Sequence, residues 1–355
     1  MTARADNEIP AVAAPARSPL PMADGTDIVD NFGRRIEYLR ISLTDRCNLR
    51  CVYCMPEEGV PYEDPSHILN WDEIERVVRV LAPAGLKKVR LTGGEPLVRK
   101  NVPDLAARLV AIPGICEVTL TTNGILLPRD AQALWDAGMR RVNISMDTLK
   151  PERFVQIARR PDFDRAWAGL EAALAVGFAP IKLNCVLMRG VNDDEIADFA
   201  RLTIERPLSV RFLEYMPIGM VSPPEWRARY ISNEEALTLL QRTFPDVEPL
   251  HDDAASTSRN FRIPGAQGTV GFINPISHRF CEGCNRLRLS ANGKLIPCLS
   301  DNYEYDLLTP LRAGCSDTDI VQHTRNALAH KPVQSDFEGR LQRGGSLRIM
   351  AQIGG

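Results

Sequence analysis

The chain has 355 residues, of which 44% are hydrophobic and 25% are charged, and its formal net charge is −2. This is an ordinary globular composition, with room for one large domain or two moderate ones. The near-zero net charge excludes a general attraction to polyanions such as nucleic acid, so an anionic ligand would need a local cluster of basic residues.

Residues 1–33 are expected to form a disordered N-terminal extension, because prolines interrupt an alanine-rich stretch that has no period. From Glu37 onward, short β-branched strands alternate with amphipathic helices, which is the rhythm of a parallel sheet or barrel. Strands are expected at Tyr38–Leu43, Lys88–Thr92, Glu117–Thr121, Arg141–Met146, Ile181–Leu187 and Val210–Tyr215. Helices are expected after the capping pair Asn70 and Glu73, and near 102–111, 129–137, 164–176, 193–205 and 233–243.

The βα rhythm breaks after Phe244. The stretch 245–268 is polar and predicts a loop, and the segment after it predicts strands with a hairpin at Asn292-Gly293, then two short helices. We therefore expect a barrel domain over 34–243 and a smaller C-terminal α+β domain over 244–355 that closes the open side of the barrel.

Polar and apolar residues alternate along the predicted strands. In Lys88–Thr92, for example, Arg90 and Thr92 point to one face while Val89 and Leu91 point to the other. The apolar rows need helices against them, so the polar rows are expected to face the inside of an incomplete barrel that holds a charged ligand. The alternative is an antiparallel sheet with one solvent-exposed face, which the intervening helices disfavour.

Six of the nine cysteines form two trios, Cys47, Cys51 and Cys54 with spacing C-x3-C-x2-C, and Cys281, Cys284 and Cys298 with spacing C-x2-C-x13-C. The sequence shows no signal peptide and no apolar run of membrane length, so we expect a reducing, cytoplasmic compartment. In such a compartment clustered cysteines indicate metal binding or catalysis more than disulfides. Four-iron clusters normally take four thiolates, so each trio would leave one iron free to bind a small molecule. A structural zinc site is the alternative, but zinc would lack its fourth ligand.

The remaining cysteines, Cys116, Cys185 and Cys315, are expected to bind no metal, and none of the five histidines is expected to be catalytic.

Tyr53 stands before the last cysteine of the first trio, and Gly93-Gly94-Glu95-Pro96 follows the second strand. These motifs resemble those of radical S-adenosylmethionine (SAM) enzymes. The resemblance implies that the first trio holds a [4Fe–4S] cluster whose free iron chelates SAM, and that Gly94 lets the backbone approach the methionine moiety.

The run Cys281-x2-Cys284-Asn285-Arg286-Leu287-Arg288, with Cys298 and the end Gly354-Gly355, resembles the MoaA-type GTP 3′,8-cyclases of molybdenum cofactor biosynthesis. The resemblance implies a lyase that converts GTP to (8S)-3′,8-cyclo-7,8-dihydro-GTP. It also implies a partial (βα)6 barrel and a second [4Fe–4S] cluster that binds guanine. The expected partners are GTP, an electron donor and a downstream cyclic pyranopterin monophosphate synthase, with no nucleic acid or membrane, for a monomer or homodimer.

The resemblance also assigns ligand contacts. It implies that SAM contacts Tyr53, Gly94, Ser145 and Met216, and that GTP contacts Arg40, Arg90, Thr121, Lys182, Arg286, Leu287 and Arg288. The first trio, Arg286, Arg288 and the tail Gly354-Gly355 are expected to be catalytic. The residue chemistry agrees, because guanidinium groups bind phosphate oxygens bidentately, and alternate residues of a strand such as Arg286 and Arg288 point to the same side.

Two rival functions remain open. One is a radical SAM enzyme that modifies peptides and carries an auxiliary cluster, although a peptide would not need a basic lumen. The other is a zinc-containing interaction protein without catalysis.

Overall fold

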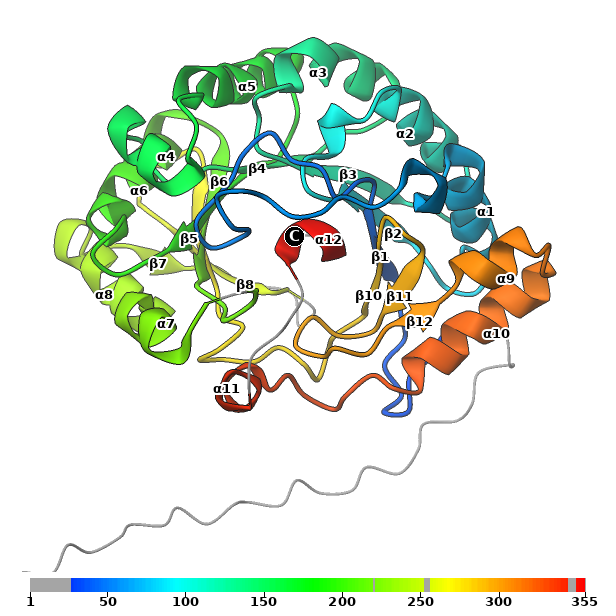
Figure 1. The fold of residues 1–355 in the computed structure, drawn as a ribbon. Coiled ribbons are helices and arrows are strands. Elements are labelled where there is room, and N and C mark those ends of the chain that lie inside the picture. Colours follow the sequence, from blue (N-terminus) through cyan, green and yellow to red (C-terminus); the bar gives the residue numbers. More distant parts are fainter. Residues whose placement is uncertain (1–26, 220, 252–255, 344–348, 355) are drawn as a thin grey trace, which may run out of the picture.

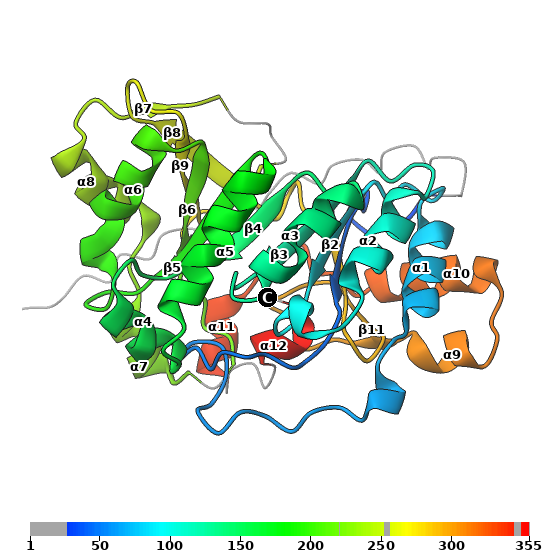
Figure 2. The ribbon, with the colours of Figure 1, turned by 90° about the horizontal axis from the view of Figure 1, so that it is seen from above.

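The computed structural model describes residues 27–219, 221–251, 256–343 and 349–354. Within these residues, twelve strands form one curved sheet with helices on its outer face (Figures 1 and 2). The six central strands lie side by side in chain order, and each is parallel to the next. They are β1 (Tyr38–Ser42), β2 (Lys88–Thr92), β3 (Glu117–Thr122), β4 (Val142–Ser145), β5 (Ile181–Leu187) and β6 (Leu208–Glu214). Parallel pairing contradicts the antiparallel alternative.

Helices connect successive strands and cover the apolar face of the sheet. They are α1 (Trp71–Leu81), α2 (Val102–Val110), α3 (Leu127–Asp136), α4 (Pro151–Ala158), α5 (Phe163–Val176), α6 (Ile196–Glu205), α7 (Pro223–Arg229) and α8 (Asn233–Thr243). The predicted capping box is confirmed, since Glu73 N–H donates to Asn70 Oδ1 and Asn70 N–H donates to Glu73 Oε2. The sequence prediction missed α4 and α7, which are short helices that begin at prolines.

The C-terminal part of the chain extends both edges of the barrel sheet. On one side, β9 (Thr269–Ile273) pairs parallel with β6, and β8 (Ser258–Arg262) and β7 (Glu248–Pro249) follow it. On the other side, β10 (Arg286–Leu289) pairs parallel with β1, and β11 (Lys294–Ile296) and β12 (Tyr305–Asp306) follow it. The hairpin expected at Asn292-Gly293 is confirmed, because it joins β10 to β11.

The prediction of a loop over 245–268 is wrong, because this stretch contains β7 and β8. Phe261 supplies the missing apolar contact by packing edge-on against Phe272 of β9, with ring centroids 5.7 Å apart. Later helices are also more numerous than the two expected. They are α9 (Leu308–Arg312), α10 (Asp317–Leu328), α11 (Phe337–Gln342) and α12 (Met350–Ile353).

The expected N-terminal extension lies outside the described residues over 1–26, but residues 27–33 differ from the expectation and belong to the fold. Ile28 is 1% exposed, and its N–H donates to the carbonyl oxygen of Ala84. The buried Asp30 carboxylate accepts hydrogen bonds from the N–H groups of Phe32 and Arg34 and from Arg34 Nε. The Ile28 bond attaches the segment to the barrel, and the Asp30 bonds fix the turn that follows it.

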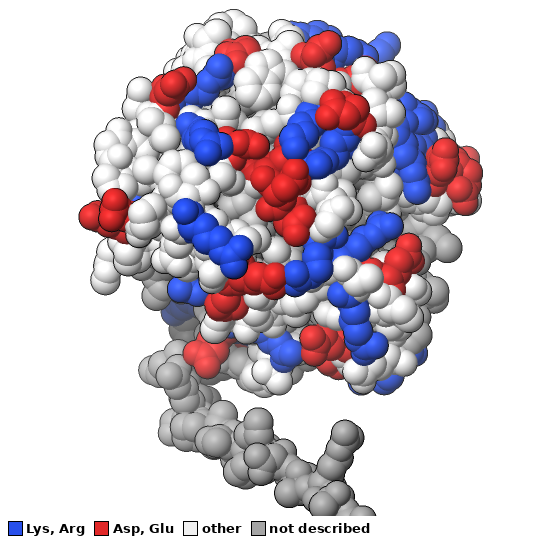
Figure 3. Space-filling model, turned by 90° about the vertical axis from the view of Figure 1, so that its left-hand side faces the viewer, with Lys and Arg blue, Asp and Glu red and all other residues white. Residues whose placement is uncertain are grey.

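The core lies between the sheet and the helices, as the alternation predicted. Val89, Leu91, Leu120 and Ile144 are fully buried in one large apolar cluster. Outside it, lysines and arginines intermix with aspartates and glutamates, so neither charge dominates the face in Figure 3. No described helix is long and apolar enough to cross a bilayer.

Candidate active site in the barrel lumen

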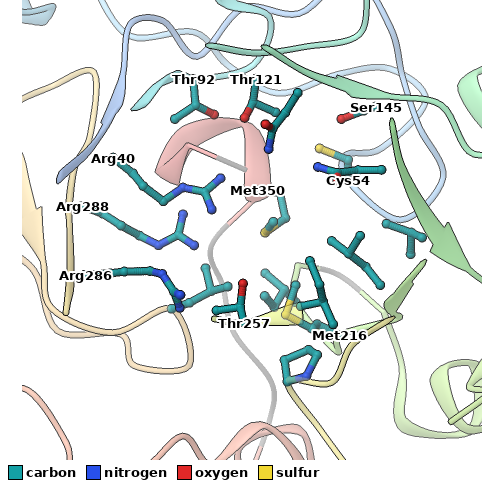
Figure 4. Close-up of a pocket in the computed structure, with 18 of the residues that line it drawn as sticks. Arg40, Cys54, Thr92, Thr121, Ser145, Met216, Thr257, Arg286, Arg288 and Met350 are labelled. Carbon is teal, nitrogen blue, oxygen red and sulfur yellow. The ribbon is translucent and has the colours of Figure 1, made fainter. Parts of the chain in front are cut away.

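The lumen of the barrel contains a chamber with a cavity volume of about 380 Å³. All six trio cysteines line it, although they come from loops far apart in the chain. The first trio follows β1, Cys281 and Cys284 precede β10, and Cys298 follows β11. The first trio lies at the carboxyl end of β1, whereas the second lies at the amino end of β10, which is parallel to β1. The two trios therefore face the lumen, part of which Figure 4 shows, from opposite ends of the strands.

The loop of the first trio is held by its own backbone and by the turn after β2. Gly93 has φ +144°, and a Cβ on Gly94 would lie 2.3 Å from the carbonyl oxygen of Arg46. Only glycine fits against the cysteine loop this closely. The family resemblance explains Gly94 by close approach to the methionine moiety of SAM. The structure shows that Gly94 also approaches the backbone of the cysteine loop.

The cysteines of the first trio are partly buried. Burial raises the pKa of Cys47 to about 11 and that of Cys54 to about 12, and burial with the nearby Asp147 also raises the pKa of Cys51. Such thiols ionise when bound iron supplies compensating positive charge, so this donor set fits an iron–sulfur cluster. Among the described residues, no three His, Cys, Asp or Glu side chains are gathered as for a single metal ion.

The second trio lies in more cationic surroundings. Burial alone would raise the pKa of the Cys284 thiol, but the positive charges of Lys331 and Arg286 hold that pKa below its usual value. Lys331 is itself anchored, because its Nζ donates to the carbonyl oxygens of Arg286 and Pro297 at 2.7 Å. Three thiolates beside fixed cations also fit a cluster with one free iron.

A wall of arginines runs between the two trios. Arg40 of β1 stands in register with Arg90 of β2 on one side and with Arg288 of β10 on the other. Figure 4 shows Arg40, Arg288 and Arg286 stacked along this wall. Burial, with the charges of Arg288 and Arg90, lowers the pKa of Arg40 well below its usual value. Uncompensated buried charge of this kind favours an anion in the chamber.

Several polar atoms on the lumen face have no hydrogen-bond partner among the described residues. These buried atoms include Arg40 Nε, Arg90 Nε, Thr121 Oγ1 and Asn184 Oδ1. Buried polar atoms are rarely left unpaired in native proteins. The chamber therefore carries donors and acceptors that suit a polar ligand.

Two buried carboxyl groups flank the first trio. Tyr53 OH donates to Asp147 Oδ2 at 2.7 Å, and burial raises the pKa of Asp147 to about 6. Burial also raises the pKa of Glu95 to about 7, although Glu95 accepts hydrogen bonds from Asn123 N, Leu97 N and Thr122 Oγ1. Ser145, Gly94 and Met216, together with Tyr53, line the same chamber.

The C-terminal helix α12 lies inside the barrel, surrounded by strands (Figure 1). Arg288 Nη1 donates to the carbonyl oxygen of Gly354 at 2.6 Å. Gly354 has φ +74°, and a Cβ there would lie 2.9 Å from Thr92 Cγ2. Met350 lines the chamber, and the backbone N–H of Ala351 is near enough to the Cys54 thiol to lower its pKa in part. Gly355 lies outside the described residues.

Two of the sequence-predicted contact residues are not part of the chamber lining. The side chain of Leu287 is 1% exposed and belongs to the apolar core, because it alternates with Arg286 and Arg288 on β10. Lys182 is on the same face of β5 as the lining residue Asn184 but is not itself among the lining residues. Burial, with the charges of Arg211, Arg141 and Arg90, lowers its pKa to about 6.

The sequence reasoning missed some lining residues. Arg211 follows the same alternation as Lys182 and Asn184, since Val210 and Phe212 are fully buried, so the pattern could have found it. Asn123, Lys331, Ser300 and Ser335 also line the chamber, and they come from loops whose position no local pattern indicates. Of the cysteines outside the trios, Cys116 is exposed and Cys185 is buried.

Comparisons with known proteins agree with this arrangement. Residues 41–203 match the model of the radical SAM superfamily, and residues 208–337 match that of the molybdenum cofactor synthesis C-terminal family. The chain is 50% identical to a GTP 3′,8-cyclase of Moorella thermoacetica over 92% of this chain and 99% of that protein. It is 48% identical to a GTP 3′,8-cyclase of Heliobacterium modesticaldum over 92% of this chain and all of that protein. Molybdenum cofactor biosynthesis protein 1 of Mus musculus is 45% identical over 86% of this chain and 48% of that protein.

Solved structures share the fold at low sequence identity. SuiB of Streptococcus suis bound to S-adenosylmethionine has a TM-score of 0.58 at 16% identity, and covers 89% of this chain and 77% of its own. The protein anSMEcpe with bound AdoMet has a TM-score of 0.56 at 14% identity, and covers 83% of this chain and 81% of its own. These likenesses show the architecture alone.

Proposed function

This chain belongs to the family of GTP 3′,8-cyclases, which are radical SAM enzymes of molybdenum cofactor biosynthesis, and we propose that its chamber holds SAM and GTP between two [4Fe–4S] clusters. The enzyme uses an iron–sulfur cluster and SAM to convert GTP to (8S)-3′,8-cyclo-7,8-dihydro-GTP. The observation that carries the proposal is the convergence of both cysteine trios on one chamber with a wall of buried arginines, in which Arg40 Nε and Arg90 Nε have no hydrogen-bond partner among the described residues.

Cys47, Cys51 and Cys54 are the proposed ligands of the first cluster, with SAM at its open iron. Tyr53, Gly94, Ser145 and Met216 would contact SAM, and all four line the chamber around the first trio. The bond from Tyr53 to Asp147 holds the cysteine loop against the end of β4, so the loop geometry is fixed before the ligand arrives.

Cys281, Cys284 and Cys298 are the proposed ligands of the second cluster, with the guanine of GTP at its open iron. Arg40, Arg90, Arg286, Arg288 and Thr121 would contact GTP directly, because each lines the chamber. A triphosphate would supply the negative charge that this wall lacks. Leu287 would contribute only its backbone.

Lys182 would join the triphosphate contacts when it is protonated. Burial, followed by repulsion from neighbouring cations, lowers the pKa of Lys182, and an anion in the chamber would raise that pKa again. Binding of GTP would therefore protonate the Lys182 amine.

The protein contributes orientation, charge and exclusion of water. Cys47, Cys51 and Cys54 would hold the first cluster, which with SAM would supply the radical chemistry that joins the ribose 3′ carbon to C8 of guanine. The arginine wall would fix the triphosphate at one end of GTP, so that the ribose is held toward the first trio. Helix α12 fills the barrel opening beside Cys54 and would limit the access of water. Gly354 and Gly355, at the end of this helix in the sequence, are proposed to take part in the reaction.

The proposed division of labour follows the chain. Residues 34–243 would carry the SAM side, and residues 244–355 the second cluster and the tail. The product would pass to a cyclic pyranopterin monophosphate synthase, and reduction would need an external electron donor. A peptide substrate is less suited to this chamber, because a neutral backbone would leave the buried arginines uncompensated.

One assay tests the proposed function. Reconstituted protein is incubated with GTP, SAM and dithionite without oxygen, and 5′-deoxyadenosine and the cyclised nucleotide are measured. We expect both products in equal amounts. Formation of 5′-deoxyadenosine with a peptide substrate but never with GTP would contradict the proposal.

A further inference from the structure

Two serine hydroxyls contact the sulfur atoms of the second trio. Cys281 Sγ lies 3.5 Å from Ser335 Oγ and accepts the Ser335 N–H at 3.3 Å. Cys298 Sγ lies 3.4 Å from Ser300 Oγ. Ser300 and Ser335 are 5% and 7% exposed, and both line the chamber. Two of the three sulfurs thus have a buried hydroxyl within hydrogen-bond distance.

The direction of these hydrogen bonds follows from the other partners. The N–H of Asp336 donates to Ser300 Oγ at 3.2 Å, so Ser300 already accepts one bond there and its own hydrogen is free to point to Cys298. A metal-bound thiolate has no hydrogen and can only accept. Once the trio binds iron, both serines must therefore act as donors to sulfur.

The two serines are held in place by one short segment of chain. Ser335 and Asp336 are consecutive, and Asp336 caps α11 by accepting a hydrogen bond from Gly339 N at 3.0 Å. From α11, Arg340 Nη2 donates to Asp301 Oδ1 at 2.8 Å, which ties the helix to the residue after Ser300. The segment thus braces both hydroxyls against the cysteines.

Hydrogen bonds to cluster sulfurs are among the factors that set the reduction potential of an iron–sulfur cluster. Reduction adds negative charge to the cluster and its thiolates, so a donor to sulfur stabilises the reduced state more than the oxidised state. The positive charges of Arg286 and Lys331 beside Cys284 act in the same direction.

We propose that Ser300 and Ser335 are positioning residues of the second cluster, which donate hydrogen bonds to Cys298 and Cys281 and raise its reduction potential. This inference rests on the proposed function, because it requires the second trio to hold a [4Fe–4S] cluster. A serine that only supports the loop would affect the amount of bound iron but not the potential of the cluster that remains.

The test is a redox titration of the reconstituted holoenzyme and of Ser300→Ala and Ser335→Ala, followed by the paramagnetic signals of the reduced clusters. For each variant we expect an about tenfold shift of the second cluster's equilibrium toward the oxidised state, which is about 59 mV for a one-electron couple. The first cluster, titrated in the same sample, is the internal reference and should not move. Ser335→Thr keeps a hydroxyl and should restore the wild-type potential.

Ser290→Ala is the matched control, because Ser290 is also buried but bonds to Asn292 and Lys294 rather than to a cysteine. An unchanged second-cluster potential in both Ser300→Ala and Ser335→Ala, with full iron content, would overturn the inference alone. Wild-type protein with only about four iron atoms would overturn the two-cluster proposal itself, and the inference with it. The proposal is supported if the reduction potential of the second cluster falls in Ser300→Ala or Ser335→Ala and does not change in Ser290→Ala.

Discussion

Arg288 donates a hydrogen bond to the carbonyl oxygen of Gly354, at 2.6 Å, in the lumen of the barrel. The arginine belongs to the strand that follows the second cysteine trio, and the glycine to the last turn of the chain. Because Arg288 is buried between Arg40 and Arg286, this carbonyl is one of the groups that offset its charge. The bond therefore brings the C-terminal tail to the arginine wall.

Deleting Gly354 and Gly355 should abolish cyclisation while both clusters remain bound and SAM is still cleaved. Gly354 lies against Arg288 and Thr92, and neither glycine is a proposed cluster ligand. The measurement is 5′-deoxyadenosine and cyclised product, with iron content as the control for folding. Normal cyclisation by the truncated protein would refute a role of the tail in the reaction.

Replacing Arg40 by alanine should weaken GTP binding by about tenfold to a hundredfold, because a charge-assisted hydrogen bond contributes about 1.5–3 kcal/mol. Binding of GTP to the reconstituted protein is measured by calorimetry. The matched control is Arg35→Ala, since Arg35 is an exposed arginine paired with Asp27 at the surface. Equal affinities of the two variants would show that Arg40 does not touch GTP.

GTP binding should take up a proton at Lys182. The pKa of this lysine is about 6 in the free protein, so at pH 7 the amine is mostly neutral, and a bound triphosphate favours the charged form. The affinity for GTP should therefore fall as pH rises above 6. Calorimetry in buffers of different ionisation enthalpy measures the proton uptake, and Lys182→Met should remove it. The same uptake in wild type and Lys182→Met would contradict this assignment.

Substituting Cys281 by alanine should halve the iron content and spare SAM cleavage. The first trio lies on a loop of its own after β1, so its cluster needs no ligand from the second trio. GTP should no longer be cyclised. Cys116→Ala is the control, since Cys116 is exposed and far from both trios in the chain. Loss of SAM cleavage in Cys281→Ala would show that the division of labour between the clusters is wrong.

Much of the barrel follows from local pattern. The alternation in Lys88–Thr92 and Ile181–Leu187 predicted both the strand bounds and the residues that face the lumen, because a two-residue period leaves no other arrangement. Strand β8 was missed because its polar sequence is typical of a loop. Its one large apolar contact, from Phe261 to Phe272 of β9, is with a residue that is not adjacent in sequence.

Other parts of the site depend on contacts that no local pattern contains. The bond from Arg288 to Gly354 and the contact of Ser335 with Cys281 join residues that are 66 and 54 positions apart. Both require the closed barrel and the returning C-terminal segment before they can form. The placement of Leu287 in the core, by contrast, follows from strand alternation. The family resemblance had instead placed Leu287 among the GTP contacts.

The central claim is that both trios hold a four-iron cluster in one chamber. Iron and acid-labile sulfide analysis of protein purified and reconstituted without oxygen tests it most directly. The account predicts about eight iron and eight sulfide per chain, falling to about four of each when either trio is replaced by alanines. Protein that contains zinc, or that never binds more than about four iron atoms, would contradict it.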